Sequence, residues 1–133
     1  MSVAVDARAS VDLTSSAGAG AEVEPAWVDV CALDDILPNS GEAALLGGRQ
    51  VALVRVGESD EVYALSNFDP FSEAFVIARG IVGDRGGRPK IASPIFKQSF
   101  CLRTGSCMDD ESVALPTYPV RVRGGRIEVG VRR

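Results

Sequence analysis

The chain has 133 residues, of which 46% are hydrophobic and 24% charged, with 14 basic and 18 acidic side chains. This composition is typical of one compact soluble domain, and no apolar run approaches the roughly 20 residues of a membrane-spanning helix. The net charge of −4 and the scattered arginines argue against a nucleic-acid partner, because phosphate-binding faces concentrate basic residues.

Residues 1–25 form the first recognisable segment. They are rich in Ala, Ser, Gly and Val without a sustained period, so they offer too little apolar surface to offset the entropy of ordering. We predict a flexible N-terminal tail here and a folded β domain over residues 26–133. The segment lacks the basic and then apolar pattern of a secretory signal, so we expect a cytoplasmic location.

From residue 27 onward, short β-type runs alternate with turn residues. A single helical turn is expected in DDILPNSG, and the paired glycines at 47–48 and 124–125 favour tight hairpins because glycine tolerates a positive φ. The expected strands are, in chain order, WVDVCAL, EAALL, QVALVRV, EVYALS, KIAS, SFCLR and the two arms of PVRVRGGRIEVGV.

About eight strands with almost no helical periodicity indicate an all-β fold, either an antiparallel β-sandwich or a small barrel. Much of its core is expected from large apolar side chains on these strands, namely Trp27, Leu53, Val54, Tyr63, Leu65, Phe100 and Leu102. Two segments, residues 66–89 and 93–98, interrupt the strand pattern with prolines and aromatics. We predict both as loops, and loops on a rigid β scaffold commonly carry function.

The chain contains no histidine, which excludes Ser-His-Asp and Cys-His catalysis and any His-ligated metal site. The cysteines at 31, 101 and 107 do not have the CxxC spacing of metal or redox motifs, so we expect reduced, partly buried thiols. A two-residue turn at Thr104–Gly105 would place Cys101 and Cys107 on opposite faces of a hairpin, whereas a three-residue turn would reverse that parity.

The stretches VYALSNFDP, GIVGD and PKIASPIFKQSFCLRTG resemble a Rieske-type iron–sulfur domain. Ferredoxin members of that family carry C-x-H in a first loop and C-x-x-H in a second, and these two thiolates and two imidazoles hold the cluster. Asp69 and Phe71 stand at the first Cys and His positions, and Ser93 and Phe96 at the second pair. The resemblance therefore implies a Rieske-like fold without a cluster, in which Phe71 and Phe96 fill the vacated volume.

Cluster-free Rieske-type domains of this kind resemble the small-subunit family of assimilatory NAD(P)H-dependent nitrite reductases. The resemblance covers most of residues 27–131. It implies a non-catalytic subunit of an oxidoreductase, with neither catalytic residues nor a cofactor in this chain. It also implies a large catalytic subunit that carries FAD, siroheme and a [4Fe–4S] cluster and reduces nitrite to ammonium with NAD(P)H in nitrate assimilation.

In a Rieske domain the two cluster loops form a tip at the surface, where a partner docks. An apolar tip with a charged rim has the composition of a protein-docking surface, in which a few aromatic side chains supply most of the affinity. Glu73 and Arg79 are expected at the rim. We predict that the large subunit docks on a tip formed by Pro70, Phe71, Pro94, Ile95, Phe96 and Lys97.

Two other functions are compatible with the residues. One is a ferredoxin-like electron-transfer protein with an atypical metal site built from cysteines and carboxylates, which bound iron would reveal. The other is a stand-alone Rieske-like binding module, which a deep apolar pocket between residues 67–75 and 93–98 would favour.

Overall fold

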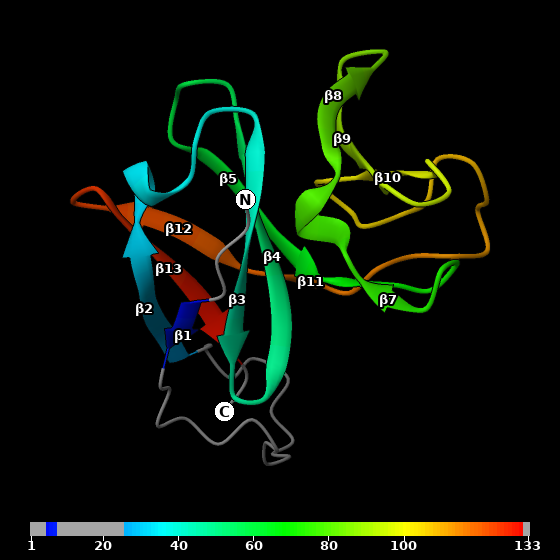
Figure 1. The fold of residues 1–133 in the computed structure, drawn as a ribbon. Coiled ribbons are helices and arrows are strands. Elements are labelled where there is room, and N and C mark those ends of the chain that lie inside the picture. The colour runs from blue at the N-terminus through cyan, green and yellow to red at the C-terminus, as the bar shows by residue number, and fades with distance from the viewer. Residues whose placement is uncertain (1–4, 8–25, 132–133) are drawn as a thin grey trace, which may run out of the picture.

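The computed structural model of the chain describes residues 5–7 and 26–131. These residues form strands joined by turns and by two single 3-10 turns, η1 (Leu33–Asp35) and η2 (Ile77–Arg79) (Figure 1). None of the described residues belongs to a helix of the length and apolar character needed to span a membrane. The prediction of an all-β fold with one helical turn near residue 34 is confirmed.

The largest sheet has five strands in the order β1-β3-β4-β5-β11. Its members are β1 (Val5–Ala7), β3 (Ser40–Leu46), β4 (Arg49–Val56), β5 (Glu61–Ser66) and β11 (Thr117–Tyr118). The β3–β4 hairpin turns at Gly47 and Gly48, whose φ angles are 57° and 82°, as the paired-glycine pattern predicts.

Strand β1 lies inside the segment predicted as a flexible tail. It pairs in parallel with β3, Val5 opposite Ala44 and Ala7 opposite Leu46, and the composition of residues 1–25 does not indicate this pairing. Residues 1–4 and 8–25, where the rest of the predicted tail falls, lie outside the described residues.

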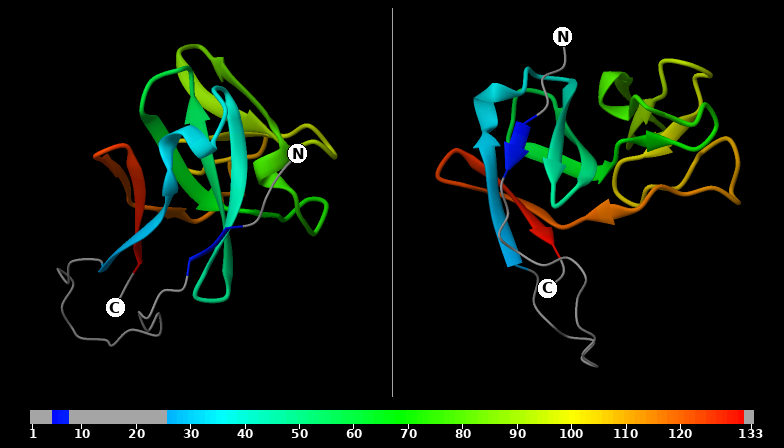
Figure 2. Two further views of the ribbon diagram at one scale, coloured as in Figure 1. Left: turned by 60° about the vertical axis from the view of Figure 1, so that its left-hand side comes forward. Right: turned by 60° about the horizontal axis from the view of Figure 1, so that its bottom comes forward.

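Two smaller sheets lie on opposite sides of β3 and β4 (Figures 1 and 2). One has the order β12-β13-β2, from β2 (Ala26–Ala32), β12 (Val120–Arg123) and β13 (Arg126–Val131). The other has the order β10-β9-β8, from β8 (Ile81–Arg85), β9 (Arg88–Ala92) and β10 (Ser99–Cys101). A short hairpin of β6 (Phe68–Asp69) and β7 (Ala74–Phe75) completes the fold. The described strands thus form four sheets, not the closed small barrel that the sequence left as an alternative.

The prediction that residues 66–89 form a loop is wrong over most of its length. The segment contains β6, β7, η2, β8 and the first residues of β9. Strands β8 and β9 form a hairpin that turns at Gly86 and Gly87, with φ angles of 62° and 84°. Glycine pairs also predict the other two hairpins. Here, however, the surrounding residues are mostly exposed and lack an apolar alternation, so the sequence does not indicate β8.

Strand β4 is buried on both faces because its alternate side chains enter two different cores. Val51 and Leu53 join the core formed with β2 and β13. Ala52 and Val54 join a second core, which packs against the smaller lobe, defined as the β10-β9-β8 sheet together with the β6–β7 hairpin. The second core contains Leu65, Phe100 and Leu102. It lies under β9 and β10 and supports the loops of residues 69–73 and 93–97, which form the candidate site.

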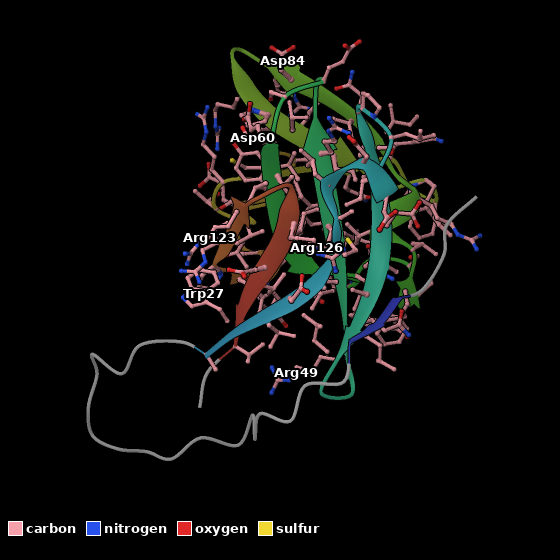
Figure 3. The ribbon with its side chains drawn as sticks, turned by 90° about the vertical axis from the view of Figure 1, so that its left-hand side faces the viewer. Trp27, Arg49, Asp60, Asp84, Arg123 and Arg126 are labelled. Carbon is pink, nitrogen blue, oxygen red and sulfur yellow. The ribbon has the colours of Figure 1, made fainter. Side chains whose placement is uncertain are left out.

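Five of the seven predicted core residues, Leu53, Val54, Leu65, Phe100 and Leu102, are fully buried. Tyr63 is half-buried and packs against the edge of the second core, whereas Trp27 is half-buried and belongs to neither core, so the prediction is wrong for Trp27. The Arg121 guanidinium lies 4.0 Å from the centre of the Trp27 ring, and Trp27 lies at the surface near Arg123 (Figure 3). The Tyr63 hydroxyl donates to Glu61. Both side chains carry a polar group on an aromatic ring, and that polar group forms hydrogen bonds most readily at the protein surface.

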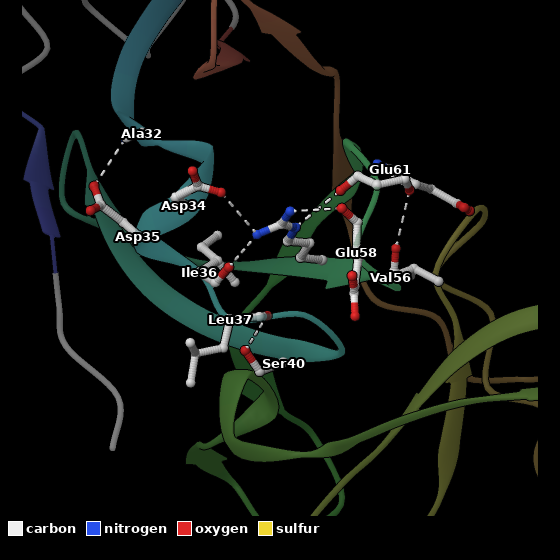
Figure 4. A network of polar contacts seen from close by, with 11 residues as sticks. Ala32, Asp34, Asp35, Ile36, Leu37, Ser40, Val56, Glu58 and Glu61 are labelled. Carbon is white, nitrogen blue, oxygen red and sulfur yellow. Dashed lines mark hydrogen bonds and ion pairs between the residues drawn. The ribbon is translucent and has the colours of Figure 1, made fainter.

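A buried arginine joins the η1 turn to the β4–β5 turn (Figure 4). The Arg55 guanidinium donates to the carbonyl oxygens of Ser59 at 3.0 Å, Glu58 at 2.9 Å and Ile36 at 2.9 Å. Its ion pair with the exposed Asp34 is longer, at 3.4 Å. The carbonyl bonds compensate for burying the charge, so Arg55 is a structural residue.

Cys31, Cys101 and Cys107 are buried and form no disulfide in the described structure, as the spacing predicts. Phe100 pairs with Cys107, and the Cys101 amide donates to the Ser106 carbonyl at 2.8 Å. The connection therefore spans residues 102–105, longer than either turn considered from the sequence. Because Cys107 lies opposite Phe100, it faces away from the side of Cys101.

Candidate partner-docking site

Two loops of the smaller lobe have the same backbone design. In the first, residues 69–73, the Glu73 amide donates to the Asp69 carbonyl at 2.7 Å; in the second, residues 93–97, the Lys97 amide donates to the Ser93 carbonyl at 3.1 Å. Glu73 and Lys97 close these five-residue turns with φ angles of 58° and 70°. The sequences DPFSE and SPIFK thus build equivalent turns in the two loops.

The first residue of each loop also caps it with its side chain. Asp69 Oδ1 accepts from the Phe71 amide at 2.9 Å, and Ser93 Oγ accepts from the Ile95 amide at 3.2 Å. Proline follows in both loops, where its restricted φ suits the turn. The local sequence therefore determines the shape of each loop separately.

A hydrogen bond connects the two loops. Ser93 Oγ donates to Asp69 Oδ2 at 2.6 Å, and Ser72 Oγ donates to the same oxygen at 2.9 Å. Asp69 and Ser93 are both completely buried, with exposed fractions of 0%. Short O–H···O⁻ contacts of this kind are strong hydrogen bonds. The two positions that the family resemblance assigns to the cluster cysteines are therefore hydrogen-bonded directly to each other.

The protonation state of Asp69 follows from these contacts. Burial alone would raise the pKa of this carboxyl, but the hydrogen bonds from Ser93, the Phe71 amide and Ser72 outweigh burial, and the net pKa lies below its usual value. Asp69 is therefore a carboxylate at neutral pH, held as an acceptor and not placed to transfer protons.

Phe71 and Phe96 do not share the role that the resemblance implies. Phe71 is half-buried, its ring centre 6.2 Å from that of the fully buried Phe100, so it packs against the second core as expected. Phe96 is 57% exposed, and the expectation that it fills the vacated volume is wrong. The turn closed by Lys97 leaves Phe96 at the surface, and the buried side chains that meet between the loops are those of Asp69 and Ser93.

The predicted tip is exposed over most of its residues. Pro70, Ile95, Phe96 and Lys97 are exposed, while Phe71 and Pro94 are half-buried. Glu73 and Arg79, predicted at the rim, are exposed as well.

Phe75, which the sequence analysis did not include in the tip, is 54% exposed on β7 next to the first loop. Its ring packs against Phe68 with ring centres 5.1 Å apart. Phe68 and Phe75 pair directly across the β6–β7 hairpin, so their side chains lie on the same face of it, and Phe68 is only half-buried. Each loop therefore has an exposed aromatic beside it or within it.

At the junction of the two loops, where a binding module would need a pocket, Asp69 and Ser93 are hydrogen-bonded to each other and fully buried. A hollow of about 450 Å³ lies elsewhere, where β3 approaches η2, and is lined by Leu37, Ser40, Gly41, Glu42, Ala78, Arg79 and Gly80. The geometry at the loops suits docking of a surface more than enclosure of a small molecule.

The residues present do not fit a Rieske cluster. Such a cluster requires two thiolates and two imidazoles. Phe71 and Phe96 have no ligating atom, and Asp69 and Ser93 are hydrogen-bonded to each other. Within residues 5–7 and 26–131, Cys, Asp and Glu side chains form no group of three or more that could hold a metal ion.

Comparison with known proteins agrees with the fold. The model of the Rieske-like [2Fe-2S] domain family matches residues 26–130. The NADH nitrite reductase small subunit of Escherichia coli K12 is 46% identical over 103 residues, which are 77% of this chain and 95% of that protein. A crystal structure from Mycobacterium tuberculosis, described as a candidate NADH-dependent nitrite reductase small subunit, aligns with a TM-score of 0.78 and 50% identity over 82% of this chain and 97% of that one.

The chain also matches part of a much longer protein. The nitrite reductase [NAD(P)H] large subunit of Klebsiella oxytoca is 45% identical over 115 residues, which are 83% of this chain but 12% of that protein. The matches to separate small subunits cover nearly their whole length, and the fold is the one that the family model describes. The chain therefore belongs to the nitrite reductase small-subunit family of Rieske-like domains.

Proposed function

We propose that the chain is the non-catalytic small subunit of a cytoplasmic NAD(P)H-dependent nitrite reductase and that it binds the large catalytic subunit. The match inside the Klebsiella oxytoca large subunit carries this proposal. A domain that belongs to the same polypeptide as the reductase stays beside it at a high effective concentration. A separate chain of the same family needs a docking surface to reach that position.

The chain's own residues support a binding role and not a catalytic one. There is no histidine, and the carboxylate between the loops is buried and fully engaged by donors. FAD, siroheme, the [4Fe–4S] cluster and the NAD(P)H site belong, by the family resemblance, to the large subunit. We propose that this chain holds no cofactor and that it positions or stabilises the large subunit.

Purified protein is expected to be colourless and to contain no stoichiometric iron or acid-labile sulfide, because Asp69, Phe71, Ser93 and Phe96 occupy the ligand positions. Iron and sulfide analysis after anaerobic purification measures this, with a Rieske ferredoxin prepared in parallel as the positive control. About two iron atoms per chain, the content of one [2Fe–2S] cluster, would overturn the cofactor-free proposal and support electron transfer instead.

The tip provides the apolar contact area for docking. Ile95 and Phe96 are 47% and 57% exposed in the second loop, and Phe75 extends the apolar surface beside the first. Glu73 and Lys97, which occupy equivalent positions in the two turns, carry opposite charges. Exposed aromatics next to mixed charges resemble an interface in which a buried anchor gives affinity and the charged rim gives orientation.

Phe96→Asp is expected to weaken binding to the large subunit by at least about 30-fold, since burying an unpaired carboxylate at an interface costs about 2 kcal/mol or more. Calorimetric titration of the purified large subunit measures the affinity, and nitrite-dependent NAD(P)H oxidation at limiting small subunit measures the consequence. Leu37→Asp is the matched control, because Leu37 is an apolar side chain, 71% exposed, outside both loops. Parental affinity in a folded Phe96→Asp variant would place the docking surface elsewhere.

A further inference from the structure

The two loops of the tip share one buried anchor. The Ile95 amide donates to Ser93 Oγ, and Ser93 Oγ donates in turn to Asp69 Oδ2. The Phe71 amide donates to the other oxygen of the same carboxylate. The third residue of each loop is therefore linked to Asp69, directly in one loop and through one hydroxyl in the other.

We propose that the Asp69–Ser93 hydrogen bond replaces the metal cluster as the tie that holds the two loops in their docking geometry. In a Rieske domain the two loops are joined because both ligate one cluster. Here the first positions of the two loops, 24 residues apart in sequence, are joined by a 2.6 Å hydrogen bond. The inference rests on the proposed function, and it makes Asp69 and Ser93 positioning residues that do not themselves touch the partner.

The choice of a carboxylate matches the donors around it. Three groups point hydrogens at Asp69, namely the Ser93 hydroxyl, the Ser72 hydroxyl and the Phe71 amide. A carboxylate accepts all of them, whereas an asparagine amide would turn two hydrogens of its own toward some of these donors. Asp69 forms no ion pair with the described residues, so these three donors together stabilise a fully buried charge.

A tie of this kind contributes to affinity by pre-organisation. Loops that are already held in the bound geometry lose less conformational entropy when the partner docks. Because Ser93 is completely buried, its removal leaves the exposed atoms of Pro70, Ile95 and Phe96 chemically unchanged. Any loss of affinity on removing the Ser93 hydroxyl therefore reports on the loop geometry and not on a lost contact with the partner.

Ser93→Ala is expected to have two measurable effects. In the isolated chain, hydrogen exchange of the Ile95 amide, followed by NMR, should accelerate by about 10-fold or more because its acceptor is gone. Affinity for the large subunit should fall by about 10-fold, measured well below the unfolding temperature so that every variant is folded.

Ser99→Ala is the matched control. Ser99 is 2% exposed in β10, and its hydroxyl accepts from Lys90 Nζ at 3.0 Å without linking the two loops. This variant loses a buried serine hydroxyl of the same lobe, so it should lower stability comparably while leaving Ile95 exchange and the affinity within about 2-fold of the parent. If the Ser93 hydroxyl contributed only to folding, Ser93→Ala and Ser99→Ala would change Ile95 exchange and affinity by similar amounts.

The double variant Asp69→Asn with Ser93→Ala tests whether the two residues act together. If one bond is the tie, the double variant should lose less affinity than the two single losses multiplied together, whereas independent contributions would combine in full. Additive losses would overturn the inference.

The outcomes separate this inference from the proposed function. Unchanged Ile95 exchange in Ser93→Ala overturns the tie regardless of binding. Faster exchange with parental affinity, while Phe96→Asp weakens binding, leaves the docking surface in place and overturns the role of the tie in docking. Parental affinity in both variants overturns the docking surface and the inference together.

Discussion

Leu102→Ala is expected to lower the free energy of unfolding by about 2–5 kcal/mol, the range for truncating a fully buried leucine. Leu102 is 1% exposed and belongs to the core that also contains Phe100 and, at its edge, Phe71. The methyl groups lost would leave a cavity that the surrounding β strands close only in part. Urea unfolding followed by circular dichroism gives the free energy for both proteins.

The control for this change is Leu37→Ala, at a leucine that is 71% exposed. A surface leucine contributes little burial, so its truncation should change the free energy of unfolding by less than about 0.5 kcal/mol. A loss below about 1 kcal/mol for Leu102→Ala would contradict its place in the core. Because this core lies under the two loops, Leu102→Ala should also weaken the packing that supports Phe71.

Gly105→Ala is expected to destabilise the protein by about 3 kcal/mol or more, through two effects that add. Gly105 has a φ of 80°, where an L side chain costs about 1–2 kcal/mol. A Cβ atom there would also lie 2.0 Å from the Leu115 carbonyl oxygen, so the backbone has to move. That movement would break two hydrogen bonds. The Gly105 amide donates to the Cys101 carbonyl at 2.7 Å, and the Leu115 amide donates to the Gly105 carbonyl at 2.8 Å.

Gly86→Ala separates the two effects. Gly86 also has a positive φ, 62°, but a Cβ atom there would meet nothing within 4 Å. Its substitution should therefore show only the conformational cost of about 1–2 kcal/mol. Thermal and urea unfolding of the two variants compare them directly, and equal losses would show that the contact with Leu115 imposes no cost of its own.

Formation of the tip depends on both local and distant interactions. Each loop is a turn that its own residues define, through a polar first residue, a proline and a final residue with positive φ. Their arrangement relative to each other depends on the contact between Asp69 and Ser93, which no local pattern specifies. The proposed docking surface therefore requires the tertiary structure, although the conformation of each of its two loops is determined by a short stretch of sequence.

Much of the fold was determined by the sequence alone because strands and hairpins depend on local rules. Short β-type runs between turn residues predict β2, β4, β5 and β13, and glycine pairs at 47–48 and 124–125 predict the β3–β4 and β12–β13 hairpins. The absence of histidine, together with Asp69 and Ser93 at the cysteine positions, already excludes a Rieske ligand set. The absence of histidine is a matter of composition, whereas the assignment of Asp69 and Ser93 to the cysteine positions comes from the family resemblance.

The tertiary structure alone decided what depends on contacts between distant residues. It shows the parallel pairing of β1 with β3, the exposure of Phe75 and Phe96, and the bond from Ser93 to Asp69. Strand β8 escaped prediction because its residues are mostly exposed and have no apolar alternation, so its pairing with β9 is what identifies it. In each case the free energy comes from a partner far along the chain, and a sequence window contains no information about that partner.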